Sequence, residues 1–355
     1  MTAGMVAAAS VSTWLRATSP VTPTASSAGT KELSLRDDAF RRAAARLDPV
    51  DTVRLHPLDQ TLVSCRFIRE EPSGTSAKFS CVLEGGQTIK VKYGRNPEIQ
   101  AEAAGTQLLH ALGFAADDVT VVPRVRCYGC PRFPFFTMQL LSLTRTTNML
   151  GPHGYENGYT DFEWVGVERK FAAASLETET QEGWAWFELK ASQAPRADVD
   201  ALRLLAVFLA HWDNKSSNQR LVCLDRPAPA RDQRCARPLL MIQDLGATFG
   251  PEKVNLARWR DLPVWADRQH CIVSMRTLPY RGATFTDVGI SEEGRLQLAR
   301  PLSALDDGAV RTLFANARFP QFYGATDDTR DLDAWTAAFR SRVDQIVTAG
   351  PCPNS

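Results

Sequence analysis

Apolar residues alternate with polar ones in several short runs in the first 140 residues of the chain. The runs and the turns between them predict strands over 61–69, 77–83, 87–93, 119–128 and 135–141. Apolar positions at roughly helical spacing predict one helix in the midst of these strands, over 97–112, which ends at Gly113. We therefore expect a small antiparallel sheet with one helix over residues 48–142.

The apolar pattern of the second part of the chain is mainly helical. Amphipathic spacing predicts helices over 32–47, 197–212, 302–317 and 332–348. Two short apolar runs, 220–224 and 239–242, read as strands around a polar excursion. The class is therefore α+β, with a larger, mainly helical part over 143–350. Residues 1–31 are rich in Ala, Ser, Thr and Pro, and we expect a disordered tail or the remnant of a signal segment there.

Charge and composition limit the kinds of partner and of protein that the chain suggests. The chain has 355 residues, 44% of them hydrophobic, and a formal net charge of +1. This balance gives no reason to expect nucleic acid as a partner. No apolar run in the sequence approaches the roughly 20 residues that a membrane-spanning helix needs. We expect a monomeric globular protein.

The eight cysteines fall partly into local pairs. Cys65 pairs with Cys81 across a predicted hairpin, Cys127 lies near Cys130, Cys223 lies near Cys235, and Cys271 and Cys352 are left over. Four disulfides would use all eight and favour a secreted or periplasmic location. Buried reduced thiols in a cytoplasmic protein, or a zinc site at the lone CxxC, are the alternatives.

A polar loop directly after the predicted helix 197–212 carries the clearest chemistry. In the stretch from His211 to Asn218, Asp213 can accept a proton from a hydroxyl, and Lys215 can offset the charge of a transferring phosphoryl group. Asn218, and Asp244 after the next strand pair, offer oxygen ligands to Mg²⁺ or Mn²⁺. The alternative is that the Asp and Asn only cap the helix or form a turn.

This spacing, H-x-D-x-K-x-x-N followed by D-L-G, resembles the catalytic loop and metal-binding motif of protein-kinase-fold enzymes. The resemblance covers about residues 61–250. Trp212 and Leu245 depart from the usual Arg and Phe, but no catalytic group is lost. The resemblance implies two lobes, an N-lobe over 48–142 that binds ATP and a C-lobe over 143–350 with the catalytic loop.

The resemblance also implies a lysine on the third strand that pairs with a glutamate on the next helix. Lys90 and Lys92 lie two apart on that strand. We favour Lys92 with Glu102, and keep Lys90 as the alternative. Lys92 would hold the α- and β-phosphates of ATP, and Glu102 would orient it.

The chain has no GxGxxG motif. The turn Ser73-Gly74-Thr75-Ser76 is the candidate phosphate loop, because its N–H and hydroxyl groups can cradle phosphates, although it also reads as an ordinary polar turn. The short loop is similar to that of atypical kinases: the HipA-like, phosphatidylinositol-kinase-like and secretory-pathway (Golgi casein-kinase-like) groups. The stretches 74–79, 91–94, 111–114 and 127–130 resemble an uncharacterised bacterial branch.

The resemblance implies an ATP-dependent phosphotransferase that moves the γ-phosphate to a hydroxyl of a protein Ser or Thr, a sugar or a small molecule. A catalytically inactive pseudokinase that acts as a binding module, an AMP transferase on the same fold, and a non-catalytic disulfide-stabilised secreted protein are the alternatives.

Overall fold

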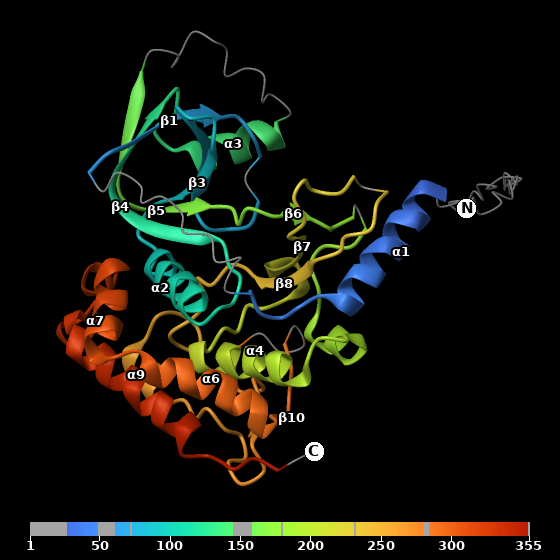
Figure 1. Cartoon of the computed structure of the whole chain (residues 1–355). Helices are drawn as coiled ribbons and strands as arrows, with labels where there is room; N and C mark the ends of the chain where they lie inside the picture. The colour runs from blue at the N-terminus through green and yellow to red at the C-terminus, as the bar shows by residue number, and fades with distance from the viewer. Residues whose placement is uncertain are drawn as a thin grey trace, which may run out of the picture.

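The computed structural model describes residues 27–48, 61–71, 73–144, 158–178, 180–230, 232–279 and 284–353. A strand-rich part lies above a helix-rich part, and the chain ends beside the helix-rich part (Figure 1). A tail is expected over residues 1–31, of which residues 1–26 lie outside the described residues. Helix α1, Ser27–Arg42, begins within the remainder, five residues before the predicted helix start.

Five strands form a closed barrel, which we call the barrel part. They are β1 Val63–Ile68, β2 Lys78–Leu83, β3 Thr88–Lys92, β4 Asp118–Tyr128 and β5 Tyr159–Arg169. In the order β1-β2-β3-β5-β4 neighbouring strands pair antiparallel, and a parallel pairing of β4 with β1 closes the ring. Alternate side chains such as Val91, Val125 and Val167 point inward and form one apolar core. The expected sheet is present, but rolled up, because the long β4 pairs with both β5 and β1.

One strand prediction in this part is wrong. Residues 135–141 belong to helix α3, Pro134–Leu143. Pro134 lies in the first turn, where its fixed φ suits a helix and its missing N–H costs nothing. A short apolar run has no period that separates a buried strand from a helix.

The strand-rich part also extends beyond the expected limit at residue 142. Strand β5 lies between β3 and β4 and completes the barrel. The predicted pattern stopped earlier because this pairing joins strands that are far apart in the sequence.

Helix α2, Glu98–Ala111, lies between the barrel and the helices below it and contacts β4, β5 and α7, Asp307–Asn316 (Figure 1). Small residues let neighbouring backbones come close to this helix. A Cβ on Gly105 would lie 3.0 Å from the Cβ of Leu245. Gly105 therefore allows α2 to pack directly on the segment that contains Asp244.

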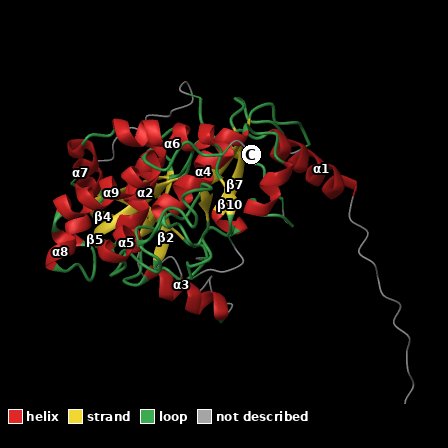
Figure 2. Ribbon diagram, turned by 90° about the horizontal axis from the view of Figure 1, so that it is seen from below, coloured by secondary structure: helices red, strands yellow, loops and turns green. Residues whose placement is uncertain are grey.

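The helix-rich part, which we call the helical part, also contains α4 Arg196–Leu209, α5 Leu256–Asp261, α6 Glu292–Ala304, α8 Asp327–Arg330 and α9 Leu332–Val347. Helix α4 packs on α6, and α9 packs on α5, α6 and α7. Seen from below, these helices lie around the strands (Figure 2). The single helix predicted over 302–317 is wrong, because Asp306 accepts a hydrogen bond from the backbone N–H of Ala309 and so starts α7.

Short strands also lie outside the barrel. Strands β6 Ala174–Ser175, β7 Gln219–Cys223 and β8 Pro238–Ile242 form one sheet, and β9 Ile272–Val273 pairs with β10 Val288–Gly289. The short 3₁₀ helices are η3 Trp186–Ala191, η4 Ser216–Asn218 and η5 Phe319–Gln321. Because β7 and β8 pair antiparallel from Gln219 opposite Ile242, the residues before β7 and after β8 lie side by side.

All eight cysteines form disulfides. The bonds are Cys65–Cys81, Cys127–Cys130, Cys223–Cys235 and Cys271–Cys352. The local pairs are those that the spacing indicated, and the two leftover cysteines join β9 to the C-terminal tail.

Among the described residues, no helix has both the length and the apolar character needed to cross a membrane.

Candidate active site

Two lysines of β3 meet acidic side chains from other elements. Lys92 Nζ lies 2.5 Å from Glu102 Oε1 of α2 and 3.2 Å from Glu168 Oε2 of β5. Lys90 Nζ lies 3.0 Å from Glu168 Oε1. The structure thus places Lys92, and not Lys90, against Glu102.

Glu168 is the centre of this cluster. It is almost fully buried and also accepts a hydrogen bond from Lys170 Nζ at 2.8 Å. Lys170 in turn lies 2.7 Å from Asp117 Oδ2. The site residues predicted from the sequence do not include Glu168 or Lys170, because the pairing of β3 with β5 that brings them to Lys92 joins distant segments.

The polar loop after α4 is held in place by its own backbone. Helix α4 ends at Leu209, and the next residue, Ala210, has a φ of 56° that turns the chain away from the helix axis. Lys215 Nζ lies 3.0 Å from Asp213 Oδ1, and Asn218 Nδ2 donates to the Asp213 carbonyl at 2.7 Å. Asn214 Nδ2 donates to the His211 carbonyl at 2.7 Å. These bonds give the side chains of Asp213 and Asn218 defined positions.

Asp244 follows β8 in a conformation that is unusual for a residue with a side chain. Its φ is 52°, in the left-handed region, which costs about 1–3 kcal/mol when the surroundings impose it. Its Oδ1 lies 3.9 Å from Lys92 Nζ, and about half of its side chain is exposed. Strained backbone of this kind is common where a side chain must be aimed at a ligand.

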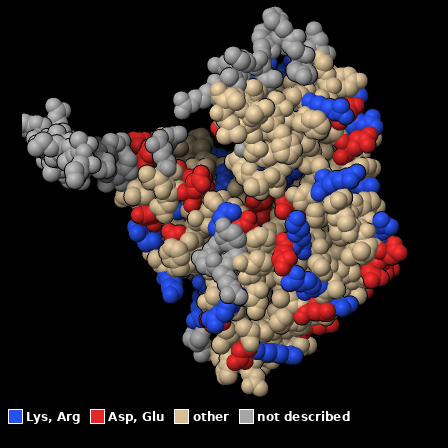
Figure 3. Space-filling view, turned by 180° about the vertical axis from the view of Figure 1, so that it is seen from behind, with Lys and Arg blue, Asp and Glu red and all other residues tan. Residues whose placement is uncertain are grey.

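One cavity of about 670 Å³, which we call the cleft, collects nearly all the predicted site residues. Its lining includes Lys92, Glu102, Asp213, Lys215, Asn218, Asp244 and all four residues of the turn Ser73, Gly74, Thr75 and Ser76. Lys90 does not line it. Seen from behind, charged side chains of both signs gather at the junction below the barrel part (Figure 3).

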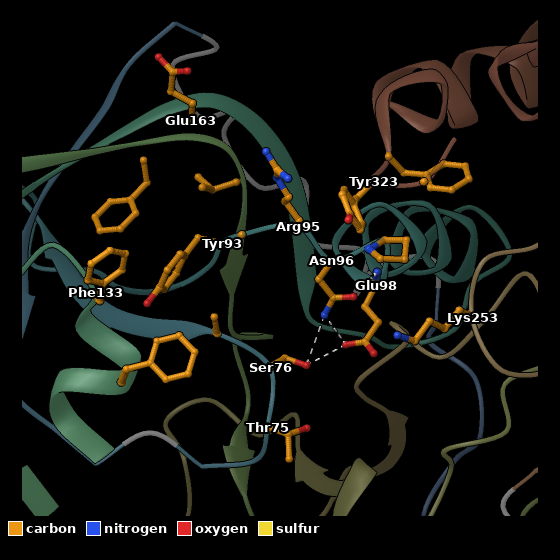
Figure 4. Close-up of a pocket in the computed structure, with 18 of the residues that line it drawn as sticks. Thr75, Ser76, Tyr93, Arg95, Asn96, Glu98, Phe133, Glu163, Lys253 and Tyr323 are labelled. Atoms are coloured by element: carbon orange, nitrogen blue, oxygen red, sulfur yellow. Dashed lines mark hydrogen bonds between the residues drawn. The ribbon is translucent and has the colours of Figure 1, made fainter. Parts of the chain in front are cut away.

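The turn at the edge of the cleft is tied to the start of α2. Ser76 Oγ donates to Glu98 Oε2 at 2.8 Å, and Asn96 Nδ2 donates to the same oxygen at 2.7 Å (Figure 4). Gly74 has a φ of 73°, which a residue with a Cβ adopts only at a cost. The turn therefore lies over the cleft in a set position.

Sequence reasoning missed Lys78, which also lines the cleft. It lies opposite Lys92 in the β2–β3 register. The signal was present in the sequence, because residues 78 and 92 are equally far from Gly85 in the middle of the connecting turn.

Burial and neighbouring charges set the protonation of these groups. Burial disfavours the charged form of Lys92, but Glu102, Glu168 and Asp244 raise its pKa above the ordinary value. Burial, together with Glu168 and Asp244, raises the pKa of Glu102 to about 7, against the opposing effect of Lys92. Glu168 is buried, yet the three lysines around it hold its pKa well below the usual range. Glu168 is therefore the firmly charged partner of Lys92.

The donor set of the cleft fits a hard divalent cation. Asp244 offers a half-exposed carboxylate, and the Asn218 amide nitrogen is engaged with Asp213, which leaves its oxygen for a ligand. Mg²⁺ and Mn²⁺ take oxygen ligands of these kinds.

A larger cavity of about 990 Å³ adjoins the cleft and shares Thr75, Ser76 and Glu98 with it. Tyr93, Phe133, Tyr323 and other aromatic side chains line it, together with Arg95 and Lys253 (Figure 4). It lies beyond the turn and the start of α2, away from Asp213 and Asp244, neither of which lines it.

Comparison with known proteins gives a likeness of fold. No family model matches the chain, and no curated protein matches it. Among solved structures, the proinflammatory kinase CtkA of Helicobacter pylori is similar, with 10% identity over 82% of this chain and 96% of that chain, at a TM-score of 0.44. The Golgi casein kinase has 11% identity over 81% of this chain and 71% of that chain, at a TM-score of 0.36. The same kinase with Mn/ADP bound has 11% identity over 81% of this chain and 72% of that chain, also at 0.36.

The chain is thus similar to atypical kinase-like structures. The TM-scores lie below 0.5, so this likeness concerns the fold alone.

Proposed function

We propose that this chain is an ATP-dependent phosphotransferase with a two-lobed, protein-kinase-like fold, which moves the γ-phosphate of ATP to a hydroxyl acceptor. One observation carries the proposal. A single cavity of about 670 Å³ joins the Lys92–Glu102 pair to Asp213, Asn218 and Asp244, which come from distant segments. Phosphoryl transfer depends on positioning and charge neutralisation, and these groups supply both.

The roles follow from the geometry. Asn218 and Asp244 would hold Mg²⁺ or Mn²⁺, which neutralises charge on the phosphates when bound. The turn Ser73–Ser76 would cover the phosphates with its N–H and hydroxyl groups. Lys92 would lie beside them, oriented by Glu102 and Glu168.

Asp213 would accept the proton of the acceptor hydroxyl. Its carboxylate lines the cleft and contacts Lys215, whose positive charge would offset charge on the transferring group. The N-lobe would comprise the barrel part with α2, and the C-lobe would follow Arg169. The four disulfides favour an oxidising compartment, and we expect a monomer.

The test measures transfer of label from [γ-³²P]ATP with Mg²⁺, to the protein itself and to added Ser/Thr peptides and sugars. Asp213→Asn should lower the rate about 100-fold or more, the size of a general-base contribution. Asp244→Asn should also lower it, because it removes a charged ligand of the metal ion. Asp261→Asn, which removes an exposed carboxylate on α5, is the matched control and should keep the wild-type rate.

The mass of the product identifies the reaction. A gain of one phosphate supports the proposal, whereas a gain of AMP identifies an AMP transferase. ATP binding without any transfer identifies a pseudokinase.

A further inference from the structure

The positively charged side chains that line the cleft differ in whether a carboxylate lies close to them. Lys92, Lys170, Lys215 and Arg220 each have a carboxylate oxygen within 4.0 Å, from Glu102, Asp117, Asp213 and Asp117 respectively. Lys78 also lines the cleft, but no carboxylate of the described residues lies within 4.0 Å of its ammonium group. Lys78 is therefore the one of these five cations that has no described carboxylate in direct contact.

The position of Lys78 suits a ligand that lies under the turn. It is the first residue of β2 and faces Lys92 across the β2–β3 pair, so the two side chains share one face of the sheet. Its Nζ would lie 3.2 Å from a Cβ on Gly74, which places the ammonium group beside the backbone of the candidate phosphate loop.

An occupant of the cleft would have to be anionic at this point. Like charges directly opposite on a sheet destabilise it. Burial, and then Lys92 and Lys90, lower the pKa of Lys78, against the smaller opposing effect of the more distant Asp244 and Glu168. An anion between Lys78 and the turn would remove this cost, and phosphate oxygens bind both ammonium groups and backbone N–H groups.

We propose that Lys78 binds the terminal phosphates of a nucleoside di- or triphosphate and so forms, with the turn Ser73–Ser76, the polyphosphate subsite of the cleft. This inference rests on the proposed function and changes one part of it. Lys92, compensated by Glu102 and Glu168, serves mainly to join β3 to α2 and β5. The direct ammonium contact to the outer phosphates comes from Lys78.

The test compares the binding of Mg·ATP, Mg·ADP and AMP by isothermal titration calorimetry. Lys78→Met keeps the length of the side chain and removes its charge. It should weaken ATP and ADP about 10- to 100-fold, the size of one charge-assisted hydrogen bond, and leave AMP within about twofold. Lys78→Arg keeps the charge and should retain most of the ATP affinity. Lys190→Met removes an exposed lysine outside the cleft and should change nothing.

The outcomes separate this inference from the proposed function. Wild-type protein that binds none of the three nucleotides overturns the proposed function, and this inference with it. If the wild type and Lys78→Met bind ATP equally tightly, this inference alone is overturned. Equal weakening of ATP and AMP also overturns it, because a general distortion of the cleft then explains the loss. If Lys78→Met does not fold, weakened ATP binding by Lys78→Gln supports the inference, and unchanged binding overturns it.

Discussion

Replacing Cys271 and Cys352 by serine removes the disulfide that closes the longest loop of the four. The two cysteines are 81 residues apart and join β9 to the C-terminal tail. Both are buried in the helical part. Because a disulfide stabilises mainly by restricting the unfolded chain, the loss should grow with the length of the closed loop.

The length of the closed loop gives the expected loss in the free energy of unfolding. For a separation of 81 residues the chain-entropy relation predicts a loss of about 4.5 kcal/mol in the free energy of unfolding. The Cys223–Cys235 bond closes a separation of 12 residues, for which the same relation predicts about 2.8 kcal/mol. Its cysteines are equally buried, so the double-serine variant of this pair is a matched control. The expected difference between the two variants is about 1.7 kcal/mol.

Urea unfolding followed by fluorescence and circular dichroism measures both variants against the wild type. The slope of the free energy against urea concentration must be compared as well, because a removed crosslink also expands the unfolded state. Equal losses in the two variants, or a larger loss for the short loop, would refute the loop-entropy reasoning. Titration of thiols in denaturant without reductant should find none, and eight free thiols would show that the bonds are absent.

Two further predictions concern the site. Burial, partly opposed by Asp244 and Asp213, lowers the pKa of His211 to about 4 from an ordinary value near 6.5. The unfolded chain then takes up the proton first, so the contribution of His211 to stability is present above pH 6.5 and falls by about 3 kcal/mol as the pH drops toward 4. Urea unfolding at pH 7.5 and 4.5 should show a smaller pH dependence for His211→Gln, and equal dependence in both proteins contradicts the prediction. Lys92→Ala leaves Glu102 and Glu168 buried without their shared cation, and it should lower the free energy of unfolding by about 3–5 kcal/mol. The side chain of Lys90 is more exposed, so Lys90→Ala should lower the free energy of unfolding by only about 1 kcal/mol. The same unfolding assay compares them, and a larger loss for Lys90→Ala would contradict the assignment of Lys92.

Local patterns in the sequence were sufficient where the structure depends on residues that are close along the chain. The first three strands, helix α2, and the loop that holds Asp213 and Asn218 lie where period and turn residues placed them. The same holds for three of the four disulfides, whose cysteines lie at most 16 residues apart. Helix α3 was missed because the run 135–141 is short and mostly apolar, and such a run fits a strand and a helix equally well.

The sequence by itself determined which chemical groups are available: the lysines of β3, the polar loop after α4, and an aspartate that follows β8. Only the tertiary structure decided how they combine. The pairing of β3 with β5 brings Glu168 to Lys92, and the packing of α2 brings Glu102 there rather than to Lys90. The spacing about Gly85 already indicates that Lys78 faces Lys92, but only the tertiary structure leaves Lys78 without a carboxylate within 4.0 Å among the described residues. Such contacts depend on strand register and on the approach of distant segments, and neither is encoded in the spacing of neighbouring residues.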